Sequence, residues 1–339
     1  MQSDSSSSDQ VYTLDKLDRS KERMRVILRR EFLIGSAVAG GVWGQRPDQA
    51  KLGRVAIMSL CFNPVIKSAA HPGDPKRTLE ILDLPDMIAE RYGVHHVEMQ
   101  HSHFASTEPG YLEEFRNRLK KARSSMNQIN LEFGPLNISA PDPVVRLETI
   151  DLTKKWVDHA VLLGCPRVMV NQGTLAPDVR QAAVDTLKTI NTYAKSKKVF
   201  ITMENRGAGG GRGGRAGAGA AGSPPTADAA VAPTPPRTPS ATWKVVVEVI
   251  QASGIYANPD VGNFPDEESR AAGLRVLYPL SSGSSHCHYD PERYNEANAI
   301  RISREVGYHG LYSIEASANN GPDPYAAVQT ILDELLKDI

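Results

Sequence analysis

Residues 167–205 read RVMVNQGTLAPDVRQAAVDTLKTINTYAKSKKVFITMEN and contain two short apolar runs separated by a longer amphipathic one. The runs at 167–173 and 199–205 are rich in Val, Met, Ile and Phe, which is typical of buried strands. Residues 176–197 repeat apolar side chains at helical spacing. The stretch therefore predicts two parallel strands joined by a helix.

The same alternation runs along most of the chain. Further strands are expected at 54–60, 94–100, 129–134, 255–264, 284–290 and 310–317. Helices are expected at 77–93, 111–126, 143–164, 242–254, 266–276, 294–307 and 323–338. Eight strand–helix units in one domain, residues 51–339, predict a (β/α)₈ TIM barrel. An open, doubly wound sheet is the structural alternative.

Residues 207–241, directly after the fifth expected strand, form a segment of low complexity. Gly209, Gly211 and Gly214 match the G-x-G-x-x-G pattern of dinucleotide-binding loops. That pattern requires a helix to follow, and six prolines between 224 and 239 forbid one. We therefore expect a flexible, disordered insertion rather than a phosphate-binding loop.

The N-terminal extension, residues 1–50, contains paired arginines before an apolar stretch. Arg29 and Arg30 precede residues 32–43, a run that is too short to span a bilayer. The pattern resembles a twin-arginine export signal, in a form that becomes compact if Met24 is the true start. It predicts export to the periplasm; an ordinary basic helix start, with a cytoplasmic protein, is the alternative. No stable membrane span beyond the signal is expected.

The composition of the chain limits the classes of function and partner that are expected. The 339-residue chain has a formal net charge of zero and a pI near 7.1, so no basic field attracts nucleic acid. Cys61, Cys165 and Cys287 lie far apart, so the sequence does not imply a disulfide framework or a zinc knuckle. A small-molecule partner is expected, and a homo-oligomer is compatible with the sequence.

Polar side chains gather where the expected strands end. In a barrel of this type the carboxyl ends of the strands form the active site. The polar residues at these ends, in chain order, are Glu98, Gln100, His101, His103, Asn171, Glu204, Asn205, Asp260, Asn263, His286, His288 and Glu315.

Four of these positions suit a metal ion. Glu204, Asp260 and Glu315 would repel one another without a cation, and one of His286 and His288 would add a nitrogen ligand. Both histidines face the same way because they are two residues apart on one strand; His288 is slightly preferred. Three oxygens and one nitrogen favour Mn²⁺, with Mg²⁺, Co²⁺ or Zn²⁺ as alternatives. Taken singly, each of these residues is also common as a solvated strand end or a turn residue.

The motifs VEMQ, LGCPRVMVNQG, ITMENRG, PDVGNFPDEE, HCHYD and GYHGLYSIEAS resemble the sugar phosphate isomerase/epimerase superfamily, whose barrel is xylose-isomerase-like. The resemblance implies that Glu204, Asp260, His286 or His288, and Glu315 hold one divalent metal. It also implies substrate contacts from residues at the same barrel face, for which we expect Glu98, His101, Asn171, Asn205, Asn263 and Arg293.

Some positions depart from the ketose epimerases of that superfamily. Asn263 stands where they carry a histidine, and Gly210 where they carry a second glutamate. Arg293 is near the position of an expected arginine but not clearly in register with it. The metal scaffold is therefore kept, whereas the epimerase substrate shell is not.

The expected activity is isomerisation or epimerisation of a carbohydrate by proton transfer beside a carbonyl, through an enediolate. Glu204 and Glu315 are the candidate proton carriers. A metal-dependent lyase, acting by β-elimination on a keto-sugar or glycoside, is the main alternative. A non-catalytic periplasmic sugar-binding barrel is another, and the neutral charge argues against a metal-dependent nuclease.

Overall fold

The computed structural model describes residues 48–339 except 69–70, 135, 207–241 and 318–319. The expected export signal and the insertion with its glycine pattern lie outside the described residues. The strands are β1 (Val55–Met58), β2 (His96–Gln100), β3 (Ser125–Asn130), β4 (Arg167–Met169), β5 (Phe200–Glu204), β6 (Tyr256–Asn258), β7 (Ser284–Cys287) and β8 (Leu311–Ile314). The helices are α2 (Gln49–Leu52), α3 (Leu84–Tyr92), α4 (Pro109–Lys121), α5 (Pro143–Leu163), α6 (Arg180–Ser196), α7 (Trp243–Ser253), α8 (Glu267–Leu277), α9 (Glu296–Glu305) and α10 (Pro324–Asp338).

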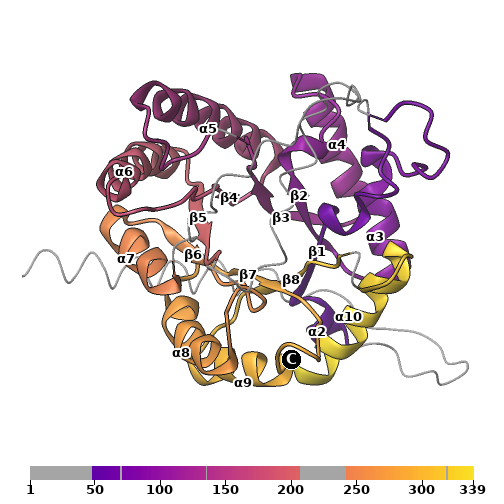
Figure 1. Ribbon diagram of the computed structural model, residues 1–339. Helices are drawn as coiled ribbons and strands as arrows, with labels where there is room; N and C mark the ends of the chain where they lie inside the picture. The colour runs from indigo at the N-terminus through magenta and orange to yellow at the C-terminus, as the bar shows by residue number, and fades with distance from the viewer. Residues whose placement is uncertain (1–47, 69–70, 135, 207–241, 318–319) are drawn as a thin grey trace, which may run out of the picture. The chain divides into compact units, whose positions relative to one another are not determined.

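The eight strands form one parallel sheet in the order β6-β5-β4-β3-β2-β1-β8-β7. Isolated parallel bridges, Ala257 to Ser281 and Asp260 to His286, join the two outer strands and nearly close the sheet into a barrel. Helices surround the strands in Figure 1. This arrangement confirms the (β/α)₈ barrel and excludes the open sheet.

Strands β6 and β7 are joined by only a few backbone contacts, and these lie beside candidate metal ligands. The His286 amide donates to the Pro259 carbonyl at 2.8 Å, beyond the last residue of β6. This pairing draws the chain after β6 alongside β7. Two candidate metal ligands from different strands, Asp260 and His286, are thereby bridged to each other.

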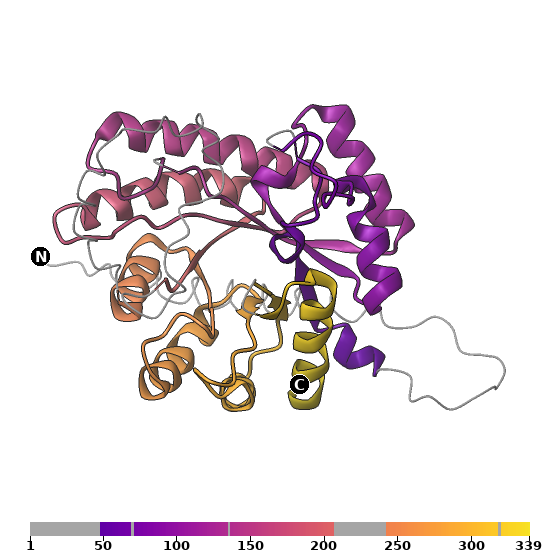
Figure 2. The ribbon, with the colours of Figure 1, turned by 45° about the vertical axis from the view of Figure 1, so that its right-hand side comes forward.

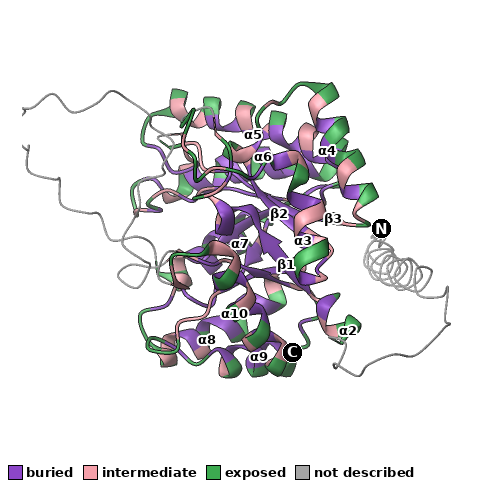
Figure 3. Ribbon diagram, turned by 90° about the vertical axis from the view of Figure 1, so that its right-hand side faces the viewer, coloured by how far each residue is buried: buried purple, intermediate pink, exposed green. Residues whose placement is uncertain are grey.

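The helices pack through apolar faces and expose their outer faces, as the burial colours of Figure 3 show. In α4 the buried positions are Leu112, Phe115 and Leu119, at helical spacing. Neighbouring helices also contact each other, as α5 and α6 do in magenta at the upper left of Figure 2. None of the described helices is both long and apolar enough to cross a membrane.

Several strands are shorter than expected, as is β6, and between residues 77 and 134 element boundaries are also displaced. The helix expected at 77–93 begins at Leu84, with Pro85 in its first turn, because proline is favoured there. The helix expected at 111–126 is α4, which ends at Lys121. The strand expected at 129–134 is β3, Ser125–Asn130. The prediction missed its first residues because Ser125, Asn127 and Gln128 are polar, although the last two are buried.

Candidate metal centre

Four side chains from four successive strands meet at the carboxyl end of the barrel. Glu204 is the last residue of β5, Asp260 follows β6, His286 lies in β7, and Glu315 follows β8. One potential ligand atom from each lies within 4.8 Å of all the others. The sequence prediction named all four, and the fold brings them together as β5 to β8 converge.

The His286 ring is oriented so that one nitrogen faces the carboxylates. Its Nε2 lies 2.7 Å from Glu98 Oε1, and because a carboxylate accepts, Nε2 carries the proton. Its Nδ1 faces Glu315 Oε2 at 3.3 Å, Glu204 Oε1 at 3.6 Å and Asp260 Oδ2 at 3.9 Å. This Nδ1 is buried and has no hydrogen-bond partner. In the neutral imidazole, the Nδ1 lone pair and the three carboxylates it faces together form the donor set that a divalent cation requires.

The electrostatic environment of His286 also favours a bound cation. Burial lowers the pKa of the imidazole, but the Glu98 and Glu204 carboxylates outweigh burial and raise that pKa well above its usual value. The carboxylates therefore favour positive charge at this point. A bound cation supplies that charge and relieves the repulsion among the carboxylates. The residues present thus fit a divalent metal.

His288 lies beside the cluster. Its Nδ1 donates to the Glu315 carbonyl at 3.0 Å, and its Nε2 lies 3.0 Å from Asp260 Oδ2. It is not among the four residues whose ligand atoms all lie within 4.8 Å of one another. The geometry therefore favours His286 as the nitrogen ligand, contrary to the slight preference for His288, and places His288 against two of the carboxylate ligands.

The Asp260 carboxylate is held in place by its neighbours. The Gly262 amide donates to Oδ1 at 2.6 Å, and Asn263 Nδ2 donates to Oδ2 at 2.9 Å. A Cβ at Gly262 would lie 2.8 Å from His288 Cδ2, so this position requires glycine. Asn205, expected to contact substrate, instead donates to the Asp260 carbonyl at 3.1 Å and accepts its amide at 2.7 Å.

A buried arginine that sequence reasoning missed braces the same loop. Arg270 of α8 is 1% exposed, and its Nε donates to the Val261 carbonyl at 2.7 Å. Its guanidinium also pairs with Glu267 and lies 4.6 Å from the centre of the Tyr294 ring. It therefore links helix α8 to the residue that follows Asp260. The sequence signal was weak, because an arginine on an amphipathic helix is usually exposed.

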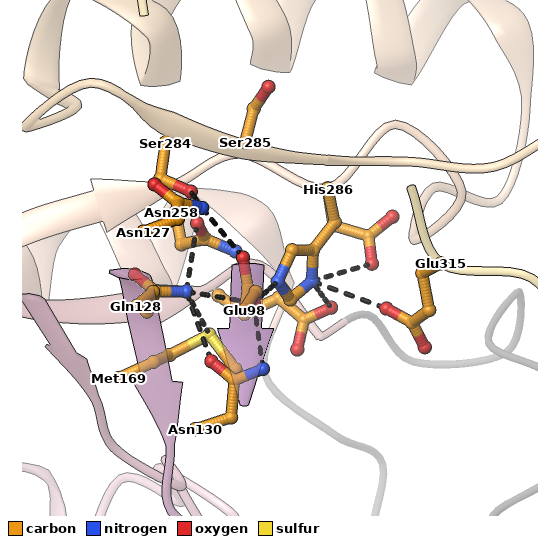
Figure 4. A network of polar contacts seen from close by, with 12 residues as sticks. Glu98, Asn127, Gln128, Asn130, Met169, Asn258, Ser284, Ser285, His286 and Glu315 are labelled. Carbon is orange, nitrogen blue, oxygen red and sulfur yellow. Dashed lines mark hydrogen bonds and ion pairs between the residues drawn. The ribbon is translucent and has the colours of Figure 1, made fainter. Parts of the chain in front are cut away.

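Beneath His286 lies a buried polar group that we call the floor: Glu98, Asn127, Gln128 and Asn130. Glu98 is 0% exposed and accepts from Asn127 Nδ2 at 2.8 Å, Asn130 Nδ2 at 2.7 Å and Gln128 Nε2 at 3.3 Å, as Figure 4 shows. Burial raises the pKa of this carboxyl, but His286 and the hydrogen bond from Asn130 help to outweigh burial and lower it. Glu98, expected to contact substrate, instead fixes the tautomer of His286.

Beside Glu204 lies a partly exposed group that we call the rim: Glu132, Asn171 and Arg206. Arg206 Nε donates to Glu204 Oε2 at 2.9 Å, and its Nη2 donates to Glu132. Asn171 Nδ2 donates to Glu132 Oε2 at 2.9 Å. Asn171 was predicted here, whereas Glu132 and Arg206 were not. Glu132 was placed inside the misassigned third strand, and Arg206 stands at the start of the glycine-rich run.

Two expected substrate contacts lie elsewhere. His101 accepts the Glu132 amide at 3.2 Å through Nδ1 and packs edge-on against Phe133 and Trp156, so it has a structural role. Arg293 lies 3.8 Å from Asp290 and lines a cavity of about 480 Å³ whose wall includes none of the four clustered residues. Asn263, by contrast, is at the centre and donates to Glu204 Oε1 at 2.7 Å.

Comparisons with known proteins agree with this architecture. Residues 88–231 match the family model described as Xylose isomerase-like TIM barrel. No curated protein matches the chain significantly. The sequence match therefore supports the family resemblance over part of the chain.

Solved structures with a similar fold extend over most of the chain. D-allulose 3-epimerase from Methylomonas sp. has a TM-score of 0.59 at 12% identity, covering 85% of this chain and 97% of that one. 3-Keto-D-glucoside 4-epimerase from E. coli has a TM-score of 0.59 at 13% identity, covering 84% and 99%. A xylose isomerase-like TIM barrel protein from Mycobacterium smegmatis, solved with magnesium, has a TM-score of 0.57 at 16% identity, covering 85% and 97%. At these identities the likeness establishes the fold.

Proposed function

We propose that the protein is a divalent-metal-dependent enzyme that isomerises or epimerises a carbohydrate by proton transfer beside a carbonyl. The observation that carries the proposal is the convergence of Glu204, Asp260, His286 and Glu315 at the carboxyl end of a barrel. Sugar epimerases among the solved structures of similar fold support the choice of substrate class. Mn²⁺ is our proposed metal, with Mg²⁺, Co²⁺ and Zn²⁺ as alternatives.

When bound, the cation would polarise the substrate carbonyl and stabilise the charge that develops on its oxygen. The protein residues then divide the remaining tasks. Glu98 keeps the proton of His286 on Nε2, so that Nδ1 stays available. Asn205 and Gly262 fix the Asp260 backbone and carboxylate.

The two candidate proton carriers differ in their surroundings. Both oxygens of Glu204 accept hydrogen bonds, from Asn263 and from Arg206, and its side chain is only 7% exposed. The Glu315 side chain is 23% exposed, and its carboxylate faces His286 Nδ1 and His288 Nε2. We propose that Glu315 removes the substrate proton, and that Glu204 has the lesser part in proton transfer.

This asymmetry favours one specific alternative. An isomerase or epimerase with two bases uses a carboxylate on each side of the substrate, whereas β-elimination requires a single base. Because both oxygens of Glu204 already accept hydrogen bonds, Glu315 could be the single base of a β-elimination. The metal-dependent lyase is therefore our second candidate.

The test is exchange of the carbon-bound proton of a sugar with solvent deuterium, followed by NMR with protein loaded with Mn²⁺ and then exchanged into Mg²⁺. A panel of D-fructose, D-tagatose, D-allulose and a 3-keto-glucoside covers the proposed class. Deuterium in a rearranged sugar supports the isomerase or epimerase, and an unsaturated product supports the lyase. Binding without exchange would favour a sugar-binding protein.

Substitution then separates the two glutamates. Glu315→Gln keeps an oxygen but cannot accept a proton, so turnover should fall by about 10²- to 10⁴-fold. Glu204→Gln should act mainly on the metal, with affinity weaker by about 10- to 100-fold. Equal turnover in both variants and in the unaltered protein would rule out this assignment.

We also propose export by the twin-arginine route, on the strength of Arg29 and Arg30 before the apolar run at 32–43. Replacement of both arginines by lysine should retain the protein in the cytoplasmic fraction. Unchanged distribution between fractions would argue against this route.

A further inference from the structure

The rim formed by Glu132, Asn171 and Arg206 adjoins the metal ligand Glu204. Arg206 is bonded to Glu204 on one side and to Glu132 on the other. The three residues follow β3, β4 and β5, so they stand together at the same end of the barrel as the metal centre. The rim is thus beside the position where a substrate bound at the centre would lie.

The rim is more exposed to solvent than three of the four ligands, Glu204, Asp260 and His286. The side chains of Arg206 and Glu132 are 39% and 29% exposed, whereas those of Asp260 and His286 are each 1% exposed. An exposed ion pair contributes little to stability, so the stability of the barrel does not explain why these charged groups stand here.

The rim is held rigidly. The Arg206 carbonyl accepts from Gln172 Nε2 at 3.0 Å, and the Glu132 amide donates to His101 Nδ1 at 3.2 Å. Asn171 Oδ1 accepts the Gly173 amide at 3.0 Å. Each of the three residues is therefore fixed by a contact of its own besides those within the rim, which is how binding groups are pre-organised.

The chemistry of the rim suits hydroxyl groups. The guanidinium has five N–H donors, the carboxylate has several acceptor positions, and the amide has both. Donors and acceptors therefore alternate across the rim, as they do along the adjacent hydroxyls of a sugar. The single positive charge of Arg206 is offset by two adjacent carboxylates, Glu132 and Glu204, so it does not attract phosphate.

We propose that Glu132, Asn171 and Arg206 bind the hydroxyl groups of an uncharged sugar whose carbonyl is at the metal centre. The proposal rests on the proposed function and specifies its substrate class: a free ketose or keto-glycoside rather than a sugar phosphate. In ketose epimerases, residues at the positions of Gly210 and near Arg293 are expected to contact the substrate. The rim would supply polar contacts to the sugar without either residue.

Binding of sugars to the full-length protein loaded with Mn²⁺ tests the proposal. The broadening of sugar proton signals by Mn²⁺ gives dissociation constants for D-fructose, D-tagatose, D-allulose and D-fructose 6-phosphate. We expect at least one free ketose to bind more tightly than the phosphate. Glu132→Gln leaves one acceptor oxygen for two donors, so that ketose should bind about 10-fold more weakly.

Two further variants test whether a loss of binding is specific to the rim. Asn171→Ala should weaken the same ketose, and Glu305→Gln, an exposed change on α9 that affects the pairs with Arg275 and Arg301, should not. Mn²⁺ affinity should stay within about threefold in these two variants and in Glu132→Gln, because none of the three residues contacts the metal cluster.

Three outcomes would overturn the proposal. If the ketose binds Glu132→Gln and Asn171→Ala as tightly as the unaltered protein, the rim has no part in recognition. Preference for the phosphate would contradict the substrate class while leaving the proposed activity intact. If Mn²⁺ binds but none of these sugars binds the unaltered protein, the proposed function and the rim assignment both fail.

Discussion

The floor and the rim are both polar, but water reaches only one of them. In the floor, the carboxylate of Glu98 is completely buried and accepts hydrogen bonds from three amides and an imidazole. In the rim, the carboxylate of Glu132 is partly exposed and accepts from Arg206 and Asn171. A buried carboxylate is costly in free energy unless all its hydrogen-bond partners are present. A partly exposed carboxylate can exchange its partners for water or a ligand.

This contrast indicates a division of labour around one metal centre. The floor sets the orientation and tautomer of His286, so it acts on the metal. The rim reaches outward from Glu204, so in our proposal it acts on the substrate. The same type of substitution should therefore have different consequences in the two regions.

The largest expected effect is that of Glu98→Gln in the floor. The amide can donate to His286 Nε2, which would move the imidazole proton to Nδ1 and remove the lone pair that faces the carboxylates. Mn²⁺ affinity should fall by about 10- to 100-fold, measured by isothermal titration calorimetry. The matched change in the rim, Glu132→Gln, should leave it within about threefold. Equal losses in both variants would erase the distinction between floor and rim.

Long-range ¹⁵N–¹H NMR of the metal-free protein checks the reason for that loss. At a pH above the raised pKa of His286, where the imidazole is neutral, its proton should be on Nε2 in the unaltered protein, and in Glu98→Gln at least part of it should be on Nδ1. If the tautomer is unchanged while affinity falls, Glu98 acts on the site in another way.

A smaller effect is expected from Arg270→Met, which removes the donor to the Val261 carbonyl beside Asp260. The loss of this buried bond should lower the free energy of unfolding by about 1–3 kcal/mol, measured by urea titration. Arg275→Met, on the same helix but in an exposed pair with Glu305, should change it by less than about 1 kcal/mol. The rise in melting temperature on addition of Mn²⁺ should shrink only for Arg270→Met. Identical behaviour of the two variants would remove Arg270 from the support of the site.

The smallest expected effect is a dependence on pH that resides in His288. Burial lowers the pKa of this imidazole, but the Asp260 and Glu315 carboxylates raise it to about 9. Because the folded pKa exceeds the unfolded value near 6.5, this stabilisation is complete below about pH 6.5 and is lost as the pH rises through about 9. The melting temperature of the metal-free protein should therefore decline over that range, and less steeply in His288→Gln. Parallel declines would show that His288 does not contribute.

The sequence revealed the barrel because most of its strands are apolar and its helices are amphipathic. It missed the position of β3, where Asn127, Gln128 and Asn130 are buried because they surround Glu98 rather than because they are apolar. Local pattern cannot reveal a partner that lies about thirty residues away and becomes adjacent only when β2 and β3 pair.

The candidate ligands were predictable for a related reason: parallel strands bring their carboxyl ends to one edge, so Glu204, Asp260 and Glu315 had to be neighbours. The choice between His286 and His288 was not predictable, since residues two apart on a strand share a face. It depends on the contact with Glu98 on one side and with the Glu315 carbonyl on the other. Arg206 and Glu132 escaped notice because their roles arise only from their contact with each other.

We propose that Glu204, Asp260, His286 and Glu315 hold one divalent ion. Equilibrium dialysis against Mn²⁺, with metal counted by mass spectrometry, tests it most directly on the unaltered protein, His286→Ala and His288→Ala. We predict about one Mn²⁺ per chain in the unaltered protein, a large loss in His286→Ala and near-full occupancy in His288→Ala. No bound metal in the unaltered protein, or equal occupancy in the unaltered protein and His286→Ala, would contradict the account.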